Sequence, residues 1–217
     1  MSRGREKTVP RLKICGITES AFALAAAKGG VDYLGLIFAE RSPRRVTPEQ
    51  ARTIIAAVRA GTVHPPRFIG VFVEHGLDEI MAIADTLGLD GIQLHAPYGA
   101  EDVAALQAKG YEVWRLAGEG PATAAFAGED AVLLDGRAGK RCGGTGQLAD
   151  WSRVSRLKRA GHRVVLAGGI SAANLREAIA TGADILDVNS ALETAPGVKS
   201  PVLLDELLRA RIHNTSI

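Results

Sequence analysis

Short apolar runs alternate with amphipathic runs along almost the whole chain. The apolar runs have the length of buried strands and begin near eight positions: Arg11, Asp32, Arg67, Gly91, Tyr111, Ala131, Arg163 and Asp184. The segments between them carry apolar residues at helical spacing, as at Leu77, Ile80, Met81, Ala84 and Leu87. Strand, helix and strand in succession require a parallel sheet, and eight such units favour closure into a single (β/α)₈ TIM barrel over an open doubly wound sheet.

The length and composition fit one domain. A chain of 217 residues with 47% hydrophobic content can bury one substantial core. We expect the barrel to occupy residues 11–211, with a flexible N-terminal extension over residues 1–10 and a C-terminal tail over residues 212–217.

Charge, hydropathy and cysteine content limit the possible binding partners and the cellular compartment of the protein. The 26 basic and 24 acidic side chains nearly balance, which argues against a general nucleic-acid surface. No stretch approaches about 18 consecutive apolar residues, and residues 1–10 are polar and basic, so neither membrane insertion nor export is expected. Two cysteines, Cys15 and Cys142, are too few for a disulfide framework or a zinc cluster. The sequence therefore favours a cytoplasmic protein whose partner is a small molecule.

Chemically useful side chains stand near the ends of several predicted strands. Cys15, Asp135 and Asp187 all fall there, and in a barrel the loops that leave these ends form the active-site face. Alternation along residues 11–15 directs Lys13 into the barrel, below Cys15. A buried lysine needs a partner, and because the last strand of a closed barrel lies beside the first, we expect Asp187 to supply it.

Three loops late in the chain are suited to an anion. They follow the sixth, seventh and eighth predicted strands and contain Gly143, Gly144, Thr145 and Gly146, then Gly168 and Gly169, then Asn189, Ser190 and Ala191. Glycine lets backbone amides approach an oxygen closely, and a helix N-terminus adds partial positive charge. Because barrels often carry a phosphate site near strands seven and eight, the three loops together predict phosphate binding.

A set of short motifs follows an order that is more specific than any one of them. The motifs are Lys13-Ile14-Cys15-Gly16-Ile17-Thr18, Ser42-Pro43-Arg44, Gly70-Val71-Phe72-Val73, Gln93-Leu94-His95, Leu133-Leu134-Asp135, Gly143-Gly144-Thr145-Gly146, Asp150-Trp151, Leu166-Ala167-Gly168-Gly169-Ile170 and Asp187-Val188. With these motifs the chain resembles the phosphoribosylanthranilate isomerase family, the (β/α)₈ enzymes of tryptophan biosynthesis. The resemblance runs from Lys13 to the last predicted helix.

The resemblance implies an Amadori rearrangement without a metal or an organic cofactor. The substrate would be N-(5-phosphoribosyl)anthranilate and the product 1-(2-carboxyphenylamino)-1-deoxyribulose 5-phosphate. Asp135 would be the general acid that protonates the ribose ring oxygen, and Cys15 would be the general base that removes the C2 proton. A thiol, with an ordinary pKa of about 8.5, is helped to ionise by a cation such as Lys13, whereas an acid such as Asp135 needs an apolar setting or desolvation by the substrate to keep its proton.

The same resemblance assigns the binding roles. Arg44 would contact the anthranilate carboxylate, Asp187 would orient the ribose region or the catalytic groups, and Gln93 and His95 would support the substrate. The three late loops would hold the phosphate. No nucleic acid, membrane or metal partner is implied, and the sequence is compatible with a monomer or a homodimer.

The chain departs from the family pattern at three places. Ala191 stands where the family usually has glycine, Ala96-Pro97-Tyr98 follows His95 where glycine is common, and Cys142 directly precedes the first phosphate loop. We expect Ala191 to preserve phosphate binding, because an amide at a helix N-terminus needs no positive φ. Cys142 is interpreted as an ordinary free thiol, with oxidative pairing to Cys15 as the alternative.

Other barrel functions stay open at this point. A metal-dependent sugar-phosphate epimerase would need a cluster of histidine and acidic ligands at the strand ends, where His95 is the one histidine so placed. Indole-glycerol-phosphate synthase relies on lysine and glutamate, and a bifunctional phosphoribosyl isomerase on two aspartates, whereas this chain offers Cys15 and Asp135. A non-catalytic phosphate barrel, kept as a ligand sensor, would bind the ligand without turnover.

Overall fold

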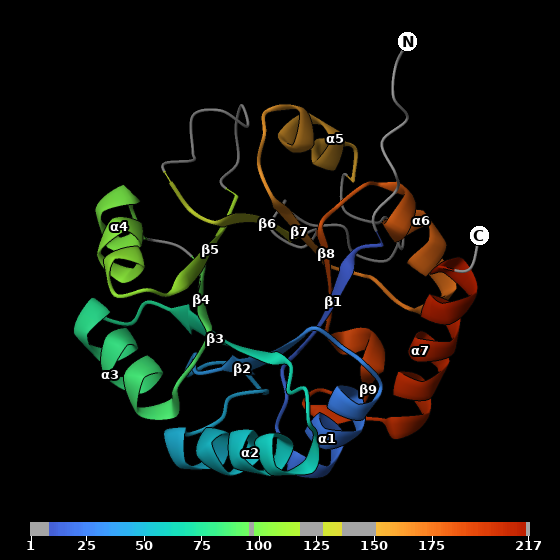
Figure 1. The fold of residues 1–217 in the computed structure, drawn as a ribbon, viewed down its shortest axis with the longest axis horizontal. Helices are drawn as coiled ribbons and strands as arrows, with labels where there is room; N and C mark the ends of the chain where they lie inside the picture. The colour runs from blue at the N-terminus through green and yellow to red at the C-terminus, as the bar shows by residue number, and fades with distance from the viewer. Residues whose placement is uncertain (1–8, 96–97, 118–127, 136–150, 216–217) are drawn as a thin grey trace.

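The computed structural model describes residues 9–95, 98–117, 128–135 and 151–215, and it forms a closed barrel of parallel strands (Figure 1). The eight strands are β1 (Arg11–Cys15), β2 (Tyr33–Ile37), β3 (Arg67–Val73), β4 (Gly91–His95), β5 (Glu112–Leu116), β6 (Ala131–Asp135), β7 (Val164–Ala167) and β8 (Ile185–Val188). The barrel closes where β1 pairs with β8, and this pairing sets Lys13 opposite Asp187. The predicted TIM barrel is confirmed.

Helices surround the strands in a ring (Figure 1). They are α1 (Ser20–Lys28), α2 (Pro48–Gly61), α3 (Leu77–Leu87), α4 (Ala100–Ala108), α5 (Ser152–Arg159), α6 (Leu175–Ala180) and α7 (Pro201–Thr215), with 3₁₀ turns η1 (Ala172–Asn174) and η2 (Ser190–Leu192). Thr47 and Gln50 cap α2 reciprocally, with Pro48 at its first position. The last helix continues to Thr215, beyond residue 211 where we expected the barrel to end. None of the helices in the described ranges is both long and apolar enough to cross a membrane.

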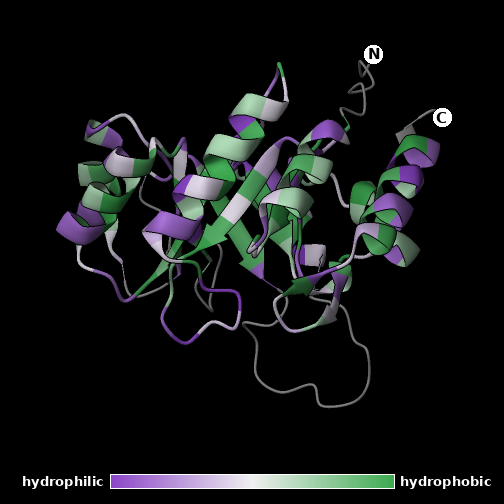
Figure 2. Cartoon of the chain, turned by 90° about the horizontal axis from the view of Figure 1, so that it is seen from below, coloured by the Kyte–Doolittle hydropathy of each residue, from purple (hydrophilic) through white to green (hydrophobic). Residues whose placement is uncertain are grey.

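Alternation along each strand separates two apolar layers. Leu12, Leu34 and Phe68 pack in the layer between strands and helices, while Tyr33 and Ile69 belong to a separate cluster inside the barrel. Figure 2 shows the strands as the hydrophobic centre, with hydrophilic residues on the helices and loops around them. The interior is therefore filled with side chains, and a binding site can form only toward its ends.

Four aspartates tie the strands together in pairs at their amino ends. Each aspartate directly precedes an even-numbered strand. Its Oδ2 accepts a hydrogen bond from a backbone amide at the start of the odd-numbered strand before it. The four bonds join Asp32 to Leu12, Asp90 to Phe68, Asp130 to Val113 and Asp184 to Val164, at 2.7–2.8 Å. The backbone amide of each aspartate bonds back to the carbonyl of the same partner, so each pair is closed by two bonds. We call these the aspartate clamps.

Polar side chains fill the same amino end of the barrel. Arg11 and Arg163 each donate to the Tyr33 hydroxyl at 2.8 Å, and Glu112 pairs with Arg163 and Arg67. Because hydrogen bonds and ion pairs fill this end, a binding site is expected at the opposite, carboxyl end.

Candidate active site

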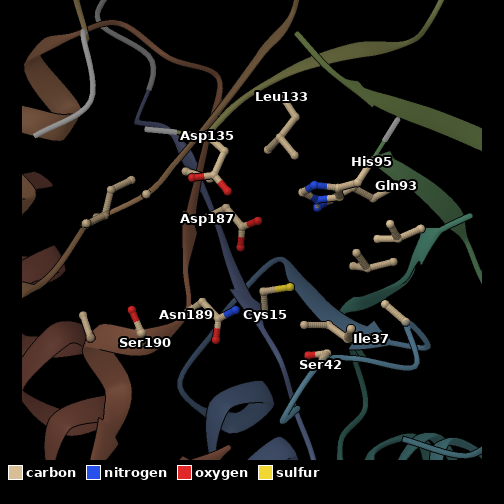
Figure 3. A pocket seen from close by; sticks show the side chains of 18 residues that line it. Cys15, Ile37, Ser42, Gln93, His95, Leu133, Asp135, Asp187, Asn189 and Ser190 are labelled. Atoms are coloured by element: carbon tan, nitrogen blue, oxygen red, sulfur yellow. Dashed lines mark hydrogen bonds between the residues drawn. The ribbon is translucent and has the colours of Figure 1, made fainter. Parts of the chain in front are cut away.

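A cavity of about 230 Å³ lies at the carboxyl ends of the strands. Cys15 from β1, His95 from β4, Asp135 from β6 and Asp187 from β8 all line it. Figure 3 shows these four side chains pointing into a common space from different sides. The structure therefore brings together the two predicted catalytic residues, Cys15 and Asp135, which are far apart in the sequence.

Cys15 is a free, buried thiol at the last position of β1. Gly35 on the neighbouring strand makes room for it, because a Cβ at Gly35 would lie 2.8 Å from the Cys15 Sγ and 3.1 Å from the Lys13 Cε. Burial raises the pKa of the thiol, and the nearby Lys13 lowers it. Lys13 thus acts in the predicted direction, but burial prevails, so the pKa of Cys15 is raised and the thiol is neutral at pH 7.

Lys13 lies fully buried at the centre of the barrel, as predicted from the alternation of β1. Its Nζ contacts the Asp187 Oδ2 at 2.7 Å and the Gln93 Oε1 at 2.9 Å. Burial alone would lower the pKa of Lys13, but the Asp187 carboxylate and Cys15 outweigh it and raise that pKa, which keeps the ammonium charged. The predicted pair between Lys13 and Asp187 is confirmed.

Asp187 has one carboxylate oxygen to spare. Its Oδ2 takes the bond from Lys13, while its Oδ1 is buried and has no hydrogen-bond partner among the described residues. A buried acceptor without a partner is costly, so it marks a place where a bound molecule can donate a hydrogen bond.

His95 and Asp135 form another wall of the cavity. Burial lowers the pKa of His95, while the Asp135 carboxylate opposes this shift. The imidazole is therefore neutral at pH 7. Its Nε2 lies 2.9 Å from the Gln93 Nε2, so Gln93, which is itself almost fully buried, touches both Lys13 and His95.

Arg44 lies at the edge of the site rather than among the residues that line the cavity. Its stem crosses Gly16, where a Cβ would lie 2.7 Å from the Arg44 Cδ. Its Nε and Nη2 donate to the two carboxylate oxygens of Glu193 at 2.7 and 2.6 Å, and only 16% of its side chain is exposed. Arg44 is thus an oriented cation, and its Nη1 remains outside the pair with Glu193.

The sequence analysis missed two charged residues beside Arg44. Glu193 begins the hairpin of β9 (Glu193–Ala195) and β10 (Val198–Lys199), and Lys199 ends it. The Lys199 Nζ contacts the Glu193 Oε1 at 3.0 Å and donates to the carbonyl and side-chain oxygens of Asn189 at 2.9 Å each. The hairpin thereby connects Arg44 to the loop after β8. Glu193 could have been found from its place shortly after the predicted phosphate loop Asn189-Ser190-Ala191, whereas no sequence pattern indicated Lys199.

Two of the three predicted phosphate loops reach the cavity. Gly168 and Gly169, with φ of 87° and 77°, line it after β7, and Asn189, Ser190 and Ala191 line it after β8. Ala191 has no positive φ, as expected, because Glu74 is the one non-glycine residue in the described ranges that does. The third loop, with Gly143, Gly144, Thr145 and Gly146, lies outside the described residues, as do Cys142, Ala96 and Pro97.

The fold and the site define the class of protein: a TIM-barrel enzyme with groups for acid–base chemistry at the carboxyl ends of its strands. A model of the N-(5'-phosphoribosyl)anthranilate (PRA) isomerase family matches residues 12–210. The chain belongs to this family, and it is an isomerase of tryptophan biosynthesis.

Individual relatives agree with the family match. The N-(5'-phosphoribosyl)anthranilate isomerase of Rubrobacter xylanophilus is 36% identical in an alignment of 206 residues that covers 92% of this chain and 98% of that protein. The tryptophan biosynthesis protein TrpCF of Vibrio parahaemolyticus is 34% identical in an alignment of 214 residues that covers 96% of this chain but 42% of that longer protein. The crystal structure of phosphoribosyl anthranilate isomerase from Thermus thermophilus matches with a TM-score of 0.80 at 35% identity, and covers 94% of this chain and 99% of that one.

Proposed function

We propose that this chain converts N-(5-phosphoribosyl)anthranilate to 1-(2-carboxyphenylamino)-1-deoxyribulose 5-phosphate, with Asp135 as general acid and Cys15 as general base. The observation that carries the assignment is that both side chains enter one cavity, from β6 and β1 (Figure 3). A molecule in that cavity can meet a proton donor on one side and a proton acceptor on another.

The reaction begins with two proton transfers, one to the ribose ring oxygen and one from C2, and both of these atoms are bonded to C1. Asp135 gives a proton to the ribose ring oxygen, the C1–O bond breaks, and the amine lone pair forms a C1=N Schiff base. Cys15, as the thiolate, then takes the proton from C2. The electron pair of that C–H bond forms the C1=C2 bond while the π pair of the protonated C1=N bond moves onto the nitrogen, which gives an enolamine. Tautomerisation of the enolamine gives the ketone. The Lys13 ammonium beside Cys15 lowers the pKa of the thiol and so favours the thiolate that this step requires.

Asp187 and the late loops are suited to hold the rest of the substrate. The spare Oδ1 of Asp187 can accept a hydrogen bond from a ribose hydroxyl. The loops with Gly168 and Gly169 and with Asn189, Ser190 and Ala191 line the same cavity, and their backbone amides can donate to phosphate oxygens. We expect Gly143, Gly144, Thr145 and Gly146 to complete this site.

Arg44 is the candidate for the anthranilate carboxylate. With Lys199 it places two positive charges around the single negative charge of Glu193, which leaves an excess positive charge beside the cavity. Because Nη1 of Arg44 lies outside the pair with Glu193, the guanidinium can bind a second carboxylate without leaving the first.

The same proposal covers the setting in which the enzyme acts. The proposed role of Cys15 requires a reduced cysteine outside any disulfide, and a reducing cytoplasm keeps it so. The partner is the small phosphoribosyl substrate, and the reaction requires no nucleic acid or membrane.

The direct test follows the anthranilate-type fluorescence of freshly generated phosphoribosylanthranilate after the purified protein is added. We expect rapid loss of fluorescence, at a turnover number within the usual enzymatic range of about 1–1,000 per second. Folded protein that leaves the fluorescence unchanged would refute the proposal and would favour a different phosphorylated substrate or a non-catalytic barrel.

A further inference from the structure

A chain of polar contacts crosses the barrel interior from β1 to β4. The Lys13 Nζ contacts the Gln93 Oε1 at 2.9 Å, and the Gln93 Nε2 lies 2.9 Å from the His95 Nε2. Lys13 is fully buried and Gln93 is 2% exposed, so both side chains are held by their neighbours in the barrel. Gln93 and His95 both line the cavity, and the His95 ring could hold its proton on either nitrogen.

The direction of each bond follows from what each group can donate. A lysine ammonium only donates, so the oxygen of the Gln93 amide must face Lys13. The amide nitrogen then faces His95, and because it only donates, the His95 Nε2 must accept. A proton on that Nε2 would set two donors against each other inside the barrel. The proton of the neutral imidazole therefore belongs on Nδ1.

We propose that Gln93, anchored by Lys13, is a positioning residue that fixes His95 as the neutral tautomer protonated on Nδ1. His95 then has one N–H donor left for the cavity, and this donor bonds an oxygen of the ribose part of the substrate. That the bonded oxygen belongs to a ribose rests on the proposed function. The tautomer of His95 rests on the contacts of Lys13, Gln93 and His95 alone.

A neutral donor fits the charges around His95. The charged groups that act on it are Asp135 from β6 and Lys13 from β1. A cationic imidazolium would favour the ionised form of a nearby carboxyl group, and so would weaken Asp135 as the proposed acid. A neutral ring supplies a hydrogen bond without this effect.

Gln93→Glu is the variant that reverses the bond. Its carboxylate has nearly the same shape but can only accept, so it would take one hydrogen bond from Lys13 and one from a proton on the His95 Nε2. Gln50→Glu is the matched control, because it makes the same change of charge in the exposed cap of α2, where the side-chain oxygen still accepts from the Thr47 amide.

The first measurement is ¹⁵N NMR of the imidazole nitrogens in the wild-type protein without substrate, with His95 assigned from a His95→Asn variant. We expect a protonated Nδ1 and an unprotonated Nε2 at neutral pH, and the reverse in Gln93→Glu. A wild-type signal with the proton on Nε2, or a tautomer that Gln93→Glu leaves unchanged, would overturn the proposal. Because no substrate is present, this result is independent of whether the proposed reaction is correct.

The second measurement is turnover. We expect kcat to fall about 100-fold in Gln93→Glu, with a much smaller change in KM, while Gln50→Glu keeps the wild-type kcat. His95→Asn should retain more activity than His95→Gln, because the asparagine amide nitrogen reaches the position of Nδ1 and the glutamine one that of Nε2. Equal activities of these two variants would contradict a donor at Nδ1.

Discussion

Glu193 is the residue whose surroundings alter its chemistry most clearly. Burial opposes ionisation of this carboxyl group, but hydrogen bonds from Arg44 and Lys199 outweigh burial and lower its pKa from 4.5 to about 2. The lowered pKa means that the charged form is favoured in the folded state. The contribution of Glu193 to stability is therefore present above about pH 4.5 and is lost as the pH falls toward about 2.

Comparison of the wild type with Glu193→Gln tests this pH-dependent contribution of Glu193 to stability. We expect the variant to be less stable than the wild type at neutral pH, since it leaves Arg44 and Lys199 without a carboxylate. The difference in free energy of unfolding should shrink between about pH 4.5 and about pH 2, where the wild-type carboxyl takes up its proton. Urea unfolding of both proteins across this range measures it, and a difference that does not change with pH would contradict the account.

At the scale of elements, the contact between β1 and β8 closes the barrel through a buried ion pair. Lys13 and Asp187 stand opposite each other in the register of these strands, and both side chains are at most 5% exposed. Removing one member of a buried pair leaves the other charge without compensation.

Lys13→Met should therefore lower the free energy of unfolding by about 3–5 kcal/mol. The double variant Lys13→Met with Asp187→Asn should regain much of that loss, because it removes the isolated charge. Urea unfolding of the wild type, both single variants and the double variant completes the cycle. If the double variant were no more stable than Lys13→Met, the loss would reflect packing rather than charge.

Which elements the sequence revealed depends on their length and periodicity. Alternation along β1 was enough to place Lys13 inside and to pair it with Asp187, because a closed barrel leaves little choice of neighbour. The hairpin of β9 and β10 was missed, since strands of three and two residues carry no readable period. Arg44 was consequently assigned a role without its partner Glu193, which the fold brings to it from the far end of the chain.

At the scale of the whole molecule, the two ends of the barrel have different tasks. The aspartate clamps and the network of arginines bonded to Tyr33 and Glu112 occupy the amino ends of the strands. The cavity with Cys15 and Asp135 lies at the carboxyl ends. The clamps could not be foreseen, because an aspartate just before a strand looks like an ordinary turn residue. This division predicts that substitutions at the amino ends of the strands change stability without changing catalysis.

Asp90→Ala tests the division. It removes the Asp90 side-chain acceptor of the Phe68 amide, and we expect a loss of about 1.5–3 kcal/mol in the free energy of unfolding with an unchanged kcat. Asp205→Ala, which removes an exposed carboxylate paired with Arg209 on α7, is the control and should change stability by less than about 1 kcal/mol. If the Asp90→Ala variant were fully folded but had a lower kcat, the amino and carboxyl ends of the barrel would not be independent.

The measurement that tests the central claim most directly is the kcat of Cys15→Ser and of Asp135→Asn on phosphoribosylanthranilate, with product binding measured on the same samples. We expect each substitution to reduce kcat by about 10²–10⁴-fold while product affinity stays near the wild-type value, because each removes a proton-transfer group and little volume. Near wild-type turnover in one variant would contradict the role assigned to that residue. Near wild-type turnover in both variants would contradict the mechanism.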